Sequence, residues 1–176
     1  MAERNQNLWA PWRLEYVSNI AGKDQEGGCF LCRYAAQPQP DEADLIIWRN
    51  DRCLTCFNRF PYSNGHLLIA PVVHAATLDE LPEEVLTELM RQIRDAQRLL
   101  ADTTGAHGFN VGINFGNGAG AGLPGHLHAH IVPRWEGDTN FRAVCGDVRV
   151  IPQSITELHE KMRQAAPRLA LPTLQG

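Results

Sequence analysis

Three histidines in the second half of the chain alternate with apolar residues and are the residues best suited to chemistry. They are His126, His128 and His130, and the residues between and after them are Leu127, Ala129 and Ile131. Because successive side chains of a β-strand point to opposite faces, this alternation predicts a half-buried strand with all three imidazoles on one face. Packed imidazoles need hydrogen-bond partners and repel one another when charged, so three on one face favour a functional site.

A glycine-rich segment from Gly116 to Gly125 runs directly into these histidines. Few side chains intervene there, so backbone N–H groups could approach a phosphate in front of the imidazoles. Neutral imidazole is a competent nucleophile near pH 7, because its unperturbed pKa is about 6.5. The combination predicts nucleophilic histidine chemistry on a phosphate ester, with a three-histidine catalytic zinc site as the alternative.

The segment HLHAHIV, from His126 to Val132, resembles the signature of the histidine triad family of nucleotide hydrolases and transferases. The resemblance implies that the middle histidine, His128, attacks the α-phosphorus of a nucleotide and forms a nucleotidyl-histidine intermediate. It also implies that a backbone carbonyl near the first histidine orients His128. In the same way, His130 is expected to bind phosphate oxygens and to help the leaving group depart.

A second motif of the same family resembles NRFPYSNGH, from Asn58 to His66. This resemblance implies that Asn58 hydrogen-bonds the ribose of the nucleotide. It makes His66 a third catalytic residue, as a buried partner that steadies the active-site backbone. A turn cap is the alternative for Asn58, since asparagine side chains often bond to the backbone two residues on.

Phosphate contacts are expected from the segment before the histidines. By resemblance, Asn114 and Gly116 form a phosphate- and ribose-contacting Asn-x-Gly motif. The backbone amides expected to bind equatorial phosphate oxygens are those of Gly120, Gly122 and Leu123. Many family members carry Gln and then Ser or Thr just before the first histidine, whereas this chain has GLPG. Leaving-group contacts must therefore come from elsewhere, and Asn117 is the candidate.

Four of the five cysteines form two CxxC pairs, Cys29 with Cys32 and Cys53 with Cys56. Their spacing matches a four-cysteine zinc ribbon. The second pair, however, stands in the β-prone run RCLTCF, where residues three apart face opposite sides of a sheet. We therefore expect Cys53 and Cys56 to pack as small hydrophobes.

A structural zinc ion is implied by the resemblance to histidine triad proteins with an N-terminal CxxC and to the related galactose-1-phosphate uridylyltransferases. Carried over residue by residue, the ligands are Cys29, Cys32, His74 and His126. Two thiolates and two imidazoles make a closed tetrahedral site that would hold the nucleophile in place. A redox-active CxxC is the alternative, but no thioredoxin-like pattern surrounds it.

The elements expected to position these residues form one α+β domain of the histidine triad type, over residues 29–176, after an N-terminal arm over 1–28. Strands are expected over 45–48, 52–57, 66–70 and 109–115 and at the histidines, which gives a five-stranded antiparallel sheet. Pro82 and Gly105 bound one long helix. Short flanking helices are expected after a tight CFLC turn, over 33–36, and from the N-cap Ser154 to Pro167.

The composition of the 176 residues bounds the class of protein. Sixteen Lys and Arg against twenty Asp and Glu give a net charge of −4, which argues against electrostatic binding to nucleic acid. The sequence shows neither a charged-then-apolar leader nor an apolar run long enough for a membrane span. We expect a cytoplasmic protein with no membrane partner.

Most of the chain resembles the prokaryotic diadenosine tetraphosphate phosphorylase branch of the family, through LWAPWRLEYV, HGFNVGINFG and HIVPRWEGDTNF. The branch implies that inorganic phosphate resolves an adenylyl-histidine, giving ATP and ADP, and that two sheets join in a homodimer. Trp135 would shape the base or acceptor-phosphate site, with surface packing as its alternative. The alternatives for function are a hydrolase of dinucleoside polyphosphates or phosphoramidates, and a zinc-stabilised nucleotide-binding protein without turnover.

Overall fold

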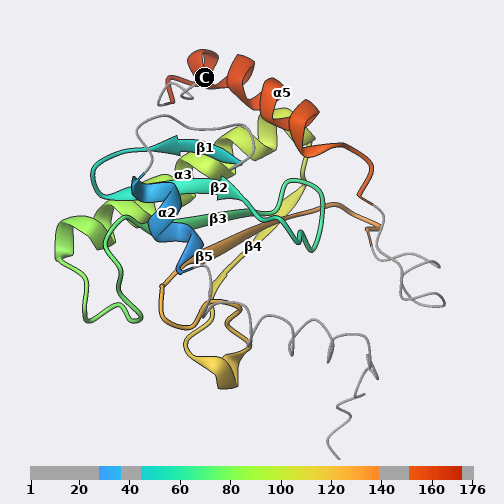
Figure 1. Cartoon of the computed structure of the whole chain (residues 1–176). Coiled ribbons are helices and arrows are strands. Elements are labelled where there is room, and N and C mark those ends of the chain that lie inside the picture. Colours follow the sequence, from blue (N-terminus) through green and yellow to red (C-terminus); the bar gives the residue numbers. More distant parts are fainter. Residues whose placement is uncertain (1–27, 37–44, 139–150, 172–176) are drawn as a thin grey trace, which may run out of the picture.

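The structure, a computed structural model, describes residues 28–36, 45–138 and 151–171 (Figure 1). In chain order its elements are α2 (Phe30–Ala36), β1 (Ile46–Arg49), β2 (Cys53–Phe57), β3 (Leu67–Pro71), α3 (Glu83–Thr104), β4 (Gly108–Ile113), the 3-10 turn η2 (Asn117–Ala119), β5 (Ala129–Arg134) and α5 (Ile155–Arg168). The expected α+β fold is confirmed. The arm before Gly28, Cys145 and the end of PRWEGDTNF lie outside the described residues.

The five strands form one antiparallel sheet in the order β1-β2-β3-β5-β4. The first three strands follow one another along the chain, and β5 inserts between β3 and β4. This topology places the last strand, which begins within the histidine segment, in the interior of the sheet. Its neighbour β4 becomes an edge strand.

The two faces of the sheet carry separate apolar cores. Helices α3 and α5 cover one face, where Ile69, Ile131 and Leu99 are fully buried. Helix α2 lies on the other face, where Leu31 packs with Leu68. Figure 1 shows α2 in front of the sheet and α3 behind it. Any side chain on a strand therefore belongs to either the α3 side or the α2 side.

Regular strand structure begins at Ala129, so only His130 of the three histidines lies on a strand. The register of β3 and β5 pairs Ile69 with Ala129 and would bring Pro71 opposite Leu127. Proline has no N–H to donate to a ladder, and the Leu127 N–H bonds instead to the carbonyl of Ala75 at 2.7 Å. The alternation itself persists: Leu127, Ala129 and Ile131 all join the α3-side core.

The helix boundaries follow local signals with two differences. Pro82 and the left-handed Gly105 (φ 63°) bound α3, and the Ser154 side chain accepts the N–H of Glu157 at the start of α5. Helix α2, however, begins at Phe30, so Cys32 stands in its first turn rather than in a turn before it. Pro167 lies inside the last turn of α5 instead of ending it. Within the described residues, no helix is long and apolar enough to cross a membrane.

Gly65 fixes how the chain enters β3. Its φ of +75° is left-handed, and a Cβ at this position would lie 2.8 Å from the Leu100 Cδ2 of α3. Both the backbone conformation and the packing therefore require glycine. The following residue is His66, so this close approach also sets the position of a fully buried imidazole.

We predict that Gly65→Ala lowers the free energy of unfolding by about 2 to 5 kcal/mol, the sum of left-handed strain and overpacking. Urea denaturation followed by circular dichroism measures the change. Gly105→Ala is the matched control, because Gly105 is left-handed but has open space around its Cβ position. Equal losses in the two variants would contradict the packing role of Gly65.

Candidate functional site

Four histidines gather on the α2 side of the sheet. His130 pairs with Leu68, whose side chain belongs to the α2-side core, and antiparallel partners share a face. His128 and His130 have ring centroids 5.0 Å apart, and His66 and His130 are 5.2 Å apart. His66 and His126 are fully buried and His128 is 6% exposed. Their protons are therefore placed by neighbouring groups rather than by water.

His128 has its proton fixed by the backbone. Its Nδ1 lies 2.9 Å from the carbonyl oxygen of His126. A carbonyl only accepts hydrogen bonds, so Nδ1 carries the proton and the lone pair is on Nε2. Burial lowers the pKa of His128 and keeps the ring neutral at pH 7. The result is an oriented, uncharged nitrogen nucleophile.

His66 and His130 form a second chain of directed hydrogen bonds. The backbone N–H of Tyr62 donates to His66 Nδ1 at 3.1 Å, so the proton of His66 is on Nε2. That Nε2 lies 3.0 Å from His130 Nδ1, which must accept. The remaining proton of His130 is therefore on its Nε2. Among the described residues this buried Nε2 has no hydrogen-bond partner.

Both of these imidazoles are neutral at pH 7. Burial lowers the pKa of His66 to about 3, with a smaller contribution from His130. Burial also lowers the pKa of His130 to about 4, assisted by His128. A neutral His130 can donate its Nε2–H to a phosphate or leaving-group oxygen, beside the nucleophilic ring of His128.

The loop before β3 differs in detail from the expectation. His66 was expected to steady the active-site backbone, which stays a prediction; its ring accepts the backbone N–H of Tyr62 and also bonds to the ring of His130. Asn58 accepts the N–H of Phe60, which makes it a turn cap, and its amide nitrogen lies 3.2 Å from His66 Nδ1. A ribose contact of Asn58 stays a prediction. Sequence reasoning missed Tyr62, whose only signal is an aromatic residue in the motif.

The backbone groups of the glycine-rich loop form hydrogen bonds with one another. The carbonyl of Gly116 accepts from two loop amides, and the Gly120 N–H donates to Asn117 at 3.0 Å. The Gly120 amide is thus already engaged in this conformation, whereas Gly122 is exposed. Leu123 packs into the α2-side core, which anchors the loop. The phosphate roles of this loop, including those of Asn114 and the exposed Asn117, stay predictions.

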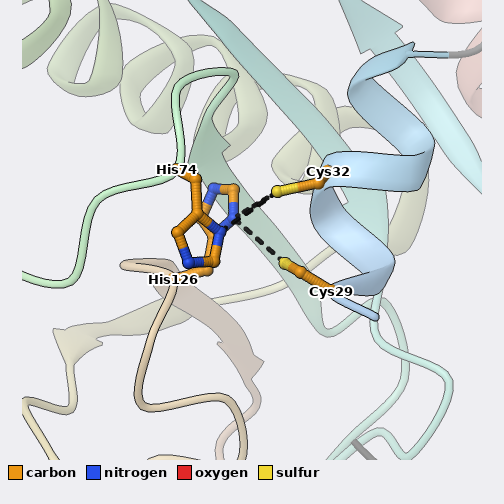
Figure 2. Close-up of side chains that lie close together, drawn as sticks. All are labelled: Cys29, Cys32, His74 and His126. Carbon is orange, nitrogen blue, oxygen red and sulfur yellow. Dashed lines mark hydrogen bonds between the residues drawn. The ribbon is translucent and has the colours of Figure 1, made fainter. Parts of the chain in front are cut away.

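A cysteine–histidine cluster includes the first of the three histidines, and Figure 2 shows its four side chains pointing toward one another. One ligand atom from each of its members lies within 4.8 Å of the others, and the members are Cys29, Cys32, His74 and His126. The His126 Nδ1 is 3.1 Å from the Cys29 sulfur, and the His74 Nδ1 is 3.1 Å from the Cys32 sulfur. These four residues could hold a metal ion, and two sulfurs with two imidazoles suit zinc.

His126 is prepared for ligation by its other ring nitrogen. Its Nε2 lies 2.9 Å from the carbonyl of Pro71, so Nε2 carries the proton and the Nδ1 lone pair faces the cysteines. Burial raises the pKa of the Cys29 thiol to about 11. A metal must therefore displace a proton from this sulfur when it binds.

Cys53 and Cys56 are not part of this cluster. They are fully buried in the α3-side and α2-side cores respectively, on opposite faces of β2. Burial raises the pKa of both thiols to about 12, so both are unreactive. The expectation that they pack as small hydrophobes is confirmed.

His128 directly precedes β5 and Trp135 directly follows it, so the length of the strand, about 20 Å, separates the two residues. Its indole N–H donates to the carbonyl of Thr104 at the end of α3. This contact is the surface packing that the sequence offered as the alternative. A role of Trp135 at the base or acceptor-phosphate site stays a prediction.

Comparisons with known proteins agree with this geometry. Residues 39–137, more than half of the chain, match the HIT domain family. The chain is 35% identical over 160 residues to the AP-4-A phosphorylase of Mycobacterium tuberculosis H37Rv, covering 86% of this chain and 80% of that protein. It is 33% identical over 114 residues to the adenylylsulfatase HINT3 of Arabidopsis thaliana, covering 64% and 55%.

A solved structure of similar fold is a Zn-bound histidine triad family protein from Mycobacterium smegmatis. It superposes with a TM-score of 0.66 at 26% identity, covering 81% of this chain and 96% of that one. The sheet, the paired histidines and the sequence matches lead to one conclusion. The chain belongs to the HIT domain family.

Proposed function

We propose that this protein is a nucleotidyltransferase that splits diadenosine tetraphosphate by phosphorolysis. The observation that carries the proposal is the unprotonated Nε2 of His128 beside the protonated Nε2 of His130. The likeness to a relative named AP-4-A phosphorylase supports the choice of substrate.

In the proposed first step, His128 Nε2 attacks one α-phosphorus of the dinucleotide. A P–N bond forms, the P–O bond to the β-phosphate breaks, and ATP leaves. The Nε2–H of His130 stabilises the departing oxygen, while the Nδ1–H bond of His128 to the backbone supports the charge that develops on its ring. In the second step, inorganic phosphate attacks the adenylyl group, ADP forms and the imidazole is released.

A hydrolase is the alternative, with water in place of phosphate and AMP in place of ADP. It is favoured by the relatives named adenylylsulfatase and bis(5'-nucleosyl)-tetraphosphatase. A binding protein without turnover is less well supported, because an unprotonated Nε2 on His128 lies beside a protonated Nε2 on His130. These are the nucleophile and the proton donor that a transfer reaction needs. The cytoplasmic location expected from the sequence stays a prediction.

We propose that Cys29, Cys32, His74 and His126 hold a structural zinc ion. When bound, the ion supplies a rigid link between α2 and the segment before β5. The carbonyl of His126 accepts the hydrogen bond that orients His128, so a fixed His126 keeps the nucleophile in place. No chemical step passes through the metal.

We also propose a homodimer formed through β4. Its outer edge pairs with no strand in the part of the chain that the structure describes, and Val111 on this strand is 49% exposed. The opposite edge strand, β1, is covered by α5, where His159 Nε2 bonds to the carbonyl of Ile46. An open edge with an exposed apolar side chain favours pairing with a second copy.

The substrate proposal predicts ATP and ADP from diadenosine tetraphosphate only when phosphate is present. Ion-exchange analysis after incubation in phosphate and in phosphate-free buffer measures the products. His128→Ala should lower the rate by at least about 10³-fold, because the covalent step is lost. ATP and AMP in both buffers would make the protein a hydrolase, and no turnover in either would contradict the enzyme proposal.

The metal proposal predicts about one zinc ion per chain in protein purified without chelator, and a large loss of zinc in His74→Ala. Atomic absorption spectroscopy measures the ratio. The control is His107→Ala, which removes an exposed histidine outside the cluster. Unchanged zinc content in His74→Ala would show that the four residues are not the ligand set.

The dimer proposal predicts that Val111→Lys gives a monomer, because a lysine on an edge strand opposes pairing. Light scattering coupled to gel filtration measures the mass. Met90→Lys on the exposed face of α3 is the control and should remain dimeric. A dimeric Val111→Lys, or a monomeric wild type, would rule out this interface.

A further inference from the structure

We propose that Tyr62 is a positioning residue of this active site, whose phenol ring covers the His66–His130 pair and keeps the proton of His130 on Nε2. Its ring centroid lies 4.6 Å from that of His66 at 38°, and 6.0 Å from that of His130 at 17°. One aromatic side chain thus packs on both imidazoles. The catalytic consequence rests on the proposed function, whereas the proton position does not.

Tyr62 acts on the pair through its backbone as well. Its N–H donates to His66 Nδ1, which leaves the proton of His66 on Nε2 and directs it to His130 Nδ1 at 3.0 Å. His130 Nδ1 can accept only while it is unprotonated. The position of the His130 proton therefore depends on how His66 is oriented, and His66 is oriented by the residue that also packs on its ring.

Exposure of the three side chains shows what the phenol ring does. Tyr62 is 41% exposed, whereas His66 is fully buried and His130 is half-buried. The ring of Tyr62 therefore lies between solvent and the histidine pair. Without it, water could reach both nitrogens of His66 and compete with the bond to His130. Neutral imidazole can carry its proton on either nitrogen, so the two tautomers of His130 would then mix.

The wrong tautomer of His130 would place a lone pair on Nε2. That nitrogen would repel a phosphate or leaving-group oxygen instead of donating to it. Departure of a poor leaving group such as an amine, which must take up a proton to leave, depends on this donor, whereas a good leaving group such as p-nitrophenolate departs with little help. Loss of the Tyr62 ring should therefore affect the two kinds of substrate unequally.

The first test reads the protons directly, without substrate. We expect long-range ¹H–¹⁵N spectra of histidine-labelled protein to show His66 and His130 as single tautomers protonated on Nε2. Tyr62→Phe should keep this pattern, and Tyr62→Ala should give averaged shifts for both rings. Phe60→Ala, which removes a 57% exposed ring from the same loop, is the control and should match the wild type.

A wild-type pattern in Tyr62→Ala would overturn the proposal, as would averaged shifts in Tyr62→Phe. Should Tyr62→Ala not fold, Tyr62→Leu takes its place, since leucine keeps apolar bulk but covers the imidazoles without a flat ring. Partial averaging is the expected result for Tyr62→Leu. An unchanged spectrum would overturn the proposal in the same way.

The second test compares leaving groups. Tyr62→Ala should lower kcat for an alkylamide of AMP, whose leaving amine must be protonated, roughly tenfold or more. It should change kcat for the p-nitrophenyl ester of AMP by no more than about threefold. Equal losses on both substrates would show a general structural defect and overturn the proposal. If the wild type turns over neither substrate, the proposed function fails, while the spectra still decide the role of Tyr62.

Discussion

The site depends on hydrogen bonds between buried imidazoles and backbone groups that can only donate or only accept. The carbonyls of His126 and Pro71 and the N–H of Tyr62 each fix one ring proton. Burial keeps these rings neutral, so that each ring presents a lone pair on one side and a proton on the other. The fold supplies these partners from both ends of β3, with Tyr62 before the strand and Pro71 at its end, and from the segment that precedes β5.

Features set by local chemistry could be predicted from the sequence. The long helix is bounded by Pro82 and Gly105, the alternation of His126 to Ile131 separates two faces, and the second CxxC pair packs on opposite sides of β2. Each of these follows from a periodicity or from one residue with restricted backbone angles. The four cysteine and histidine positions came from family resemblance, and the structure brings them together.

Features set by distant contacts could not be predicted in this way. The strand begins at Ala129 because Pro71, 56 residues earlier, would stand opposite Leu127. The sequence left two alternatives open for Trp135, which contacts the end of α3, and it did not indicate that His66 contacts the ring of His130 as well as the backbone N–H of Tyr62. Each outcome depends on which distant segment packs beside the residue in the folded chain. The residue types around a single position do not indicate which segment that is. These distant contacts also determine which of the two ring nitrogens carries the proton in each histidine.

His126 joins two sites through two different parts of one residue. Its ring Nδ1 faces the cysteine sulfurs, and its carbonyl accepts a hydrogen bond from the Nδ1–H of His128. Thermodynamic linkage makes such a coupling reciprocal: if an occupied cluster favours one state of His128, a change in His128 must alter the affinity of the cluster by the same factor. If the cluster holds a metal ion, a covalent change at His128 and occupation of the cluster are therefore not independent, because both act on the same residue.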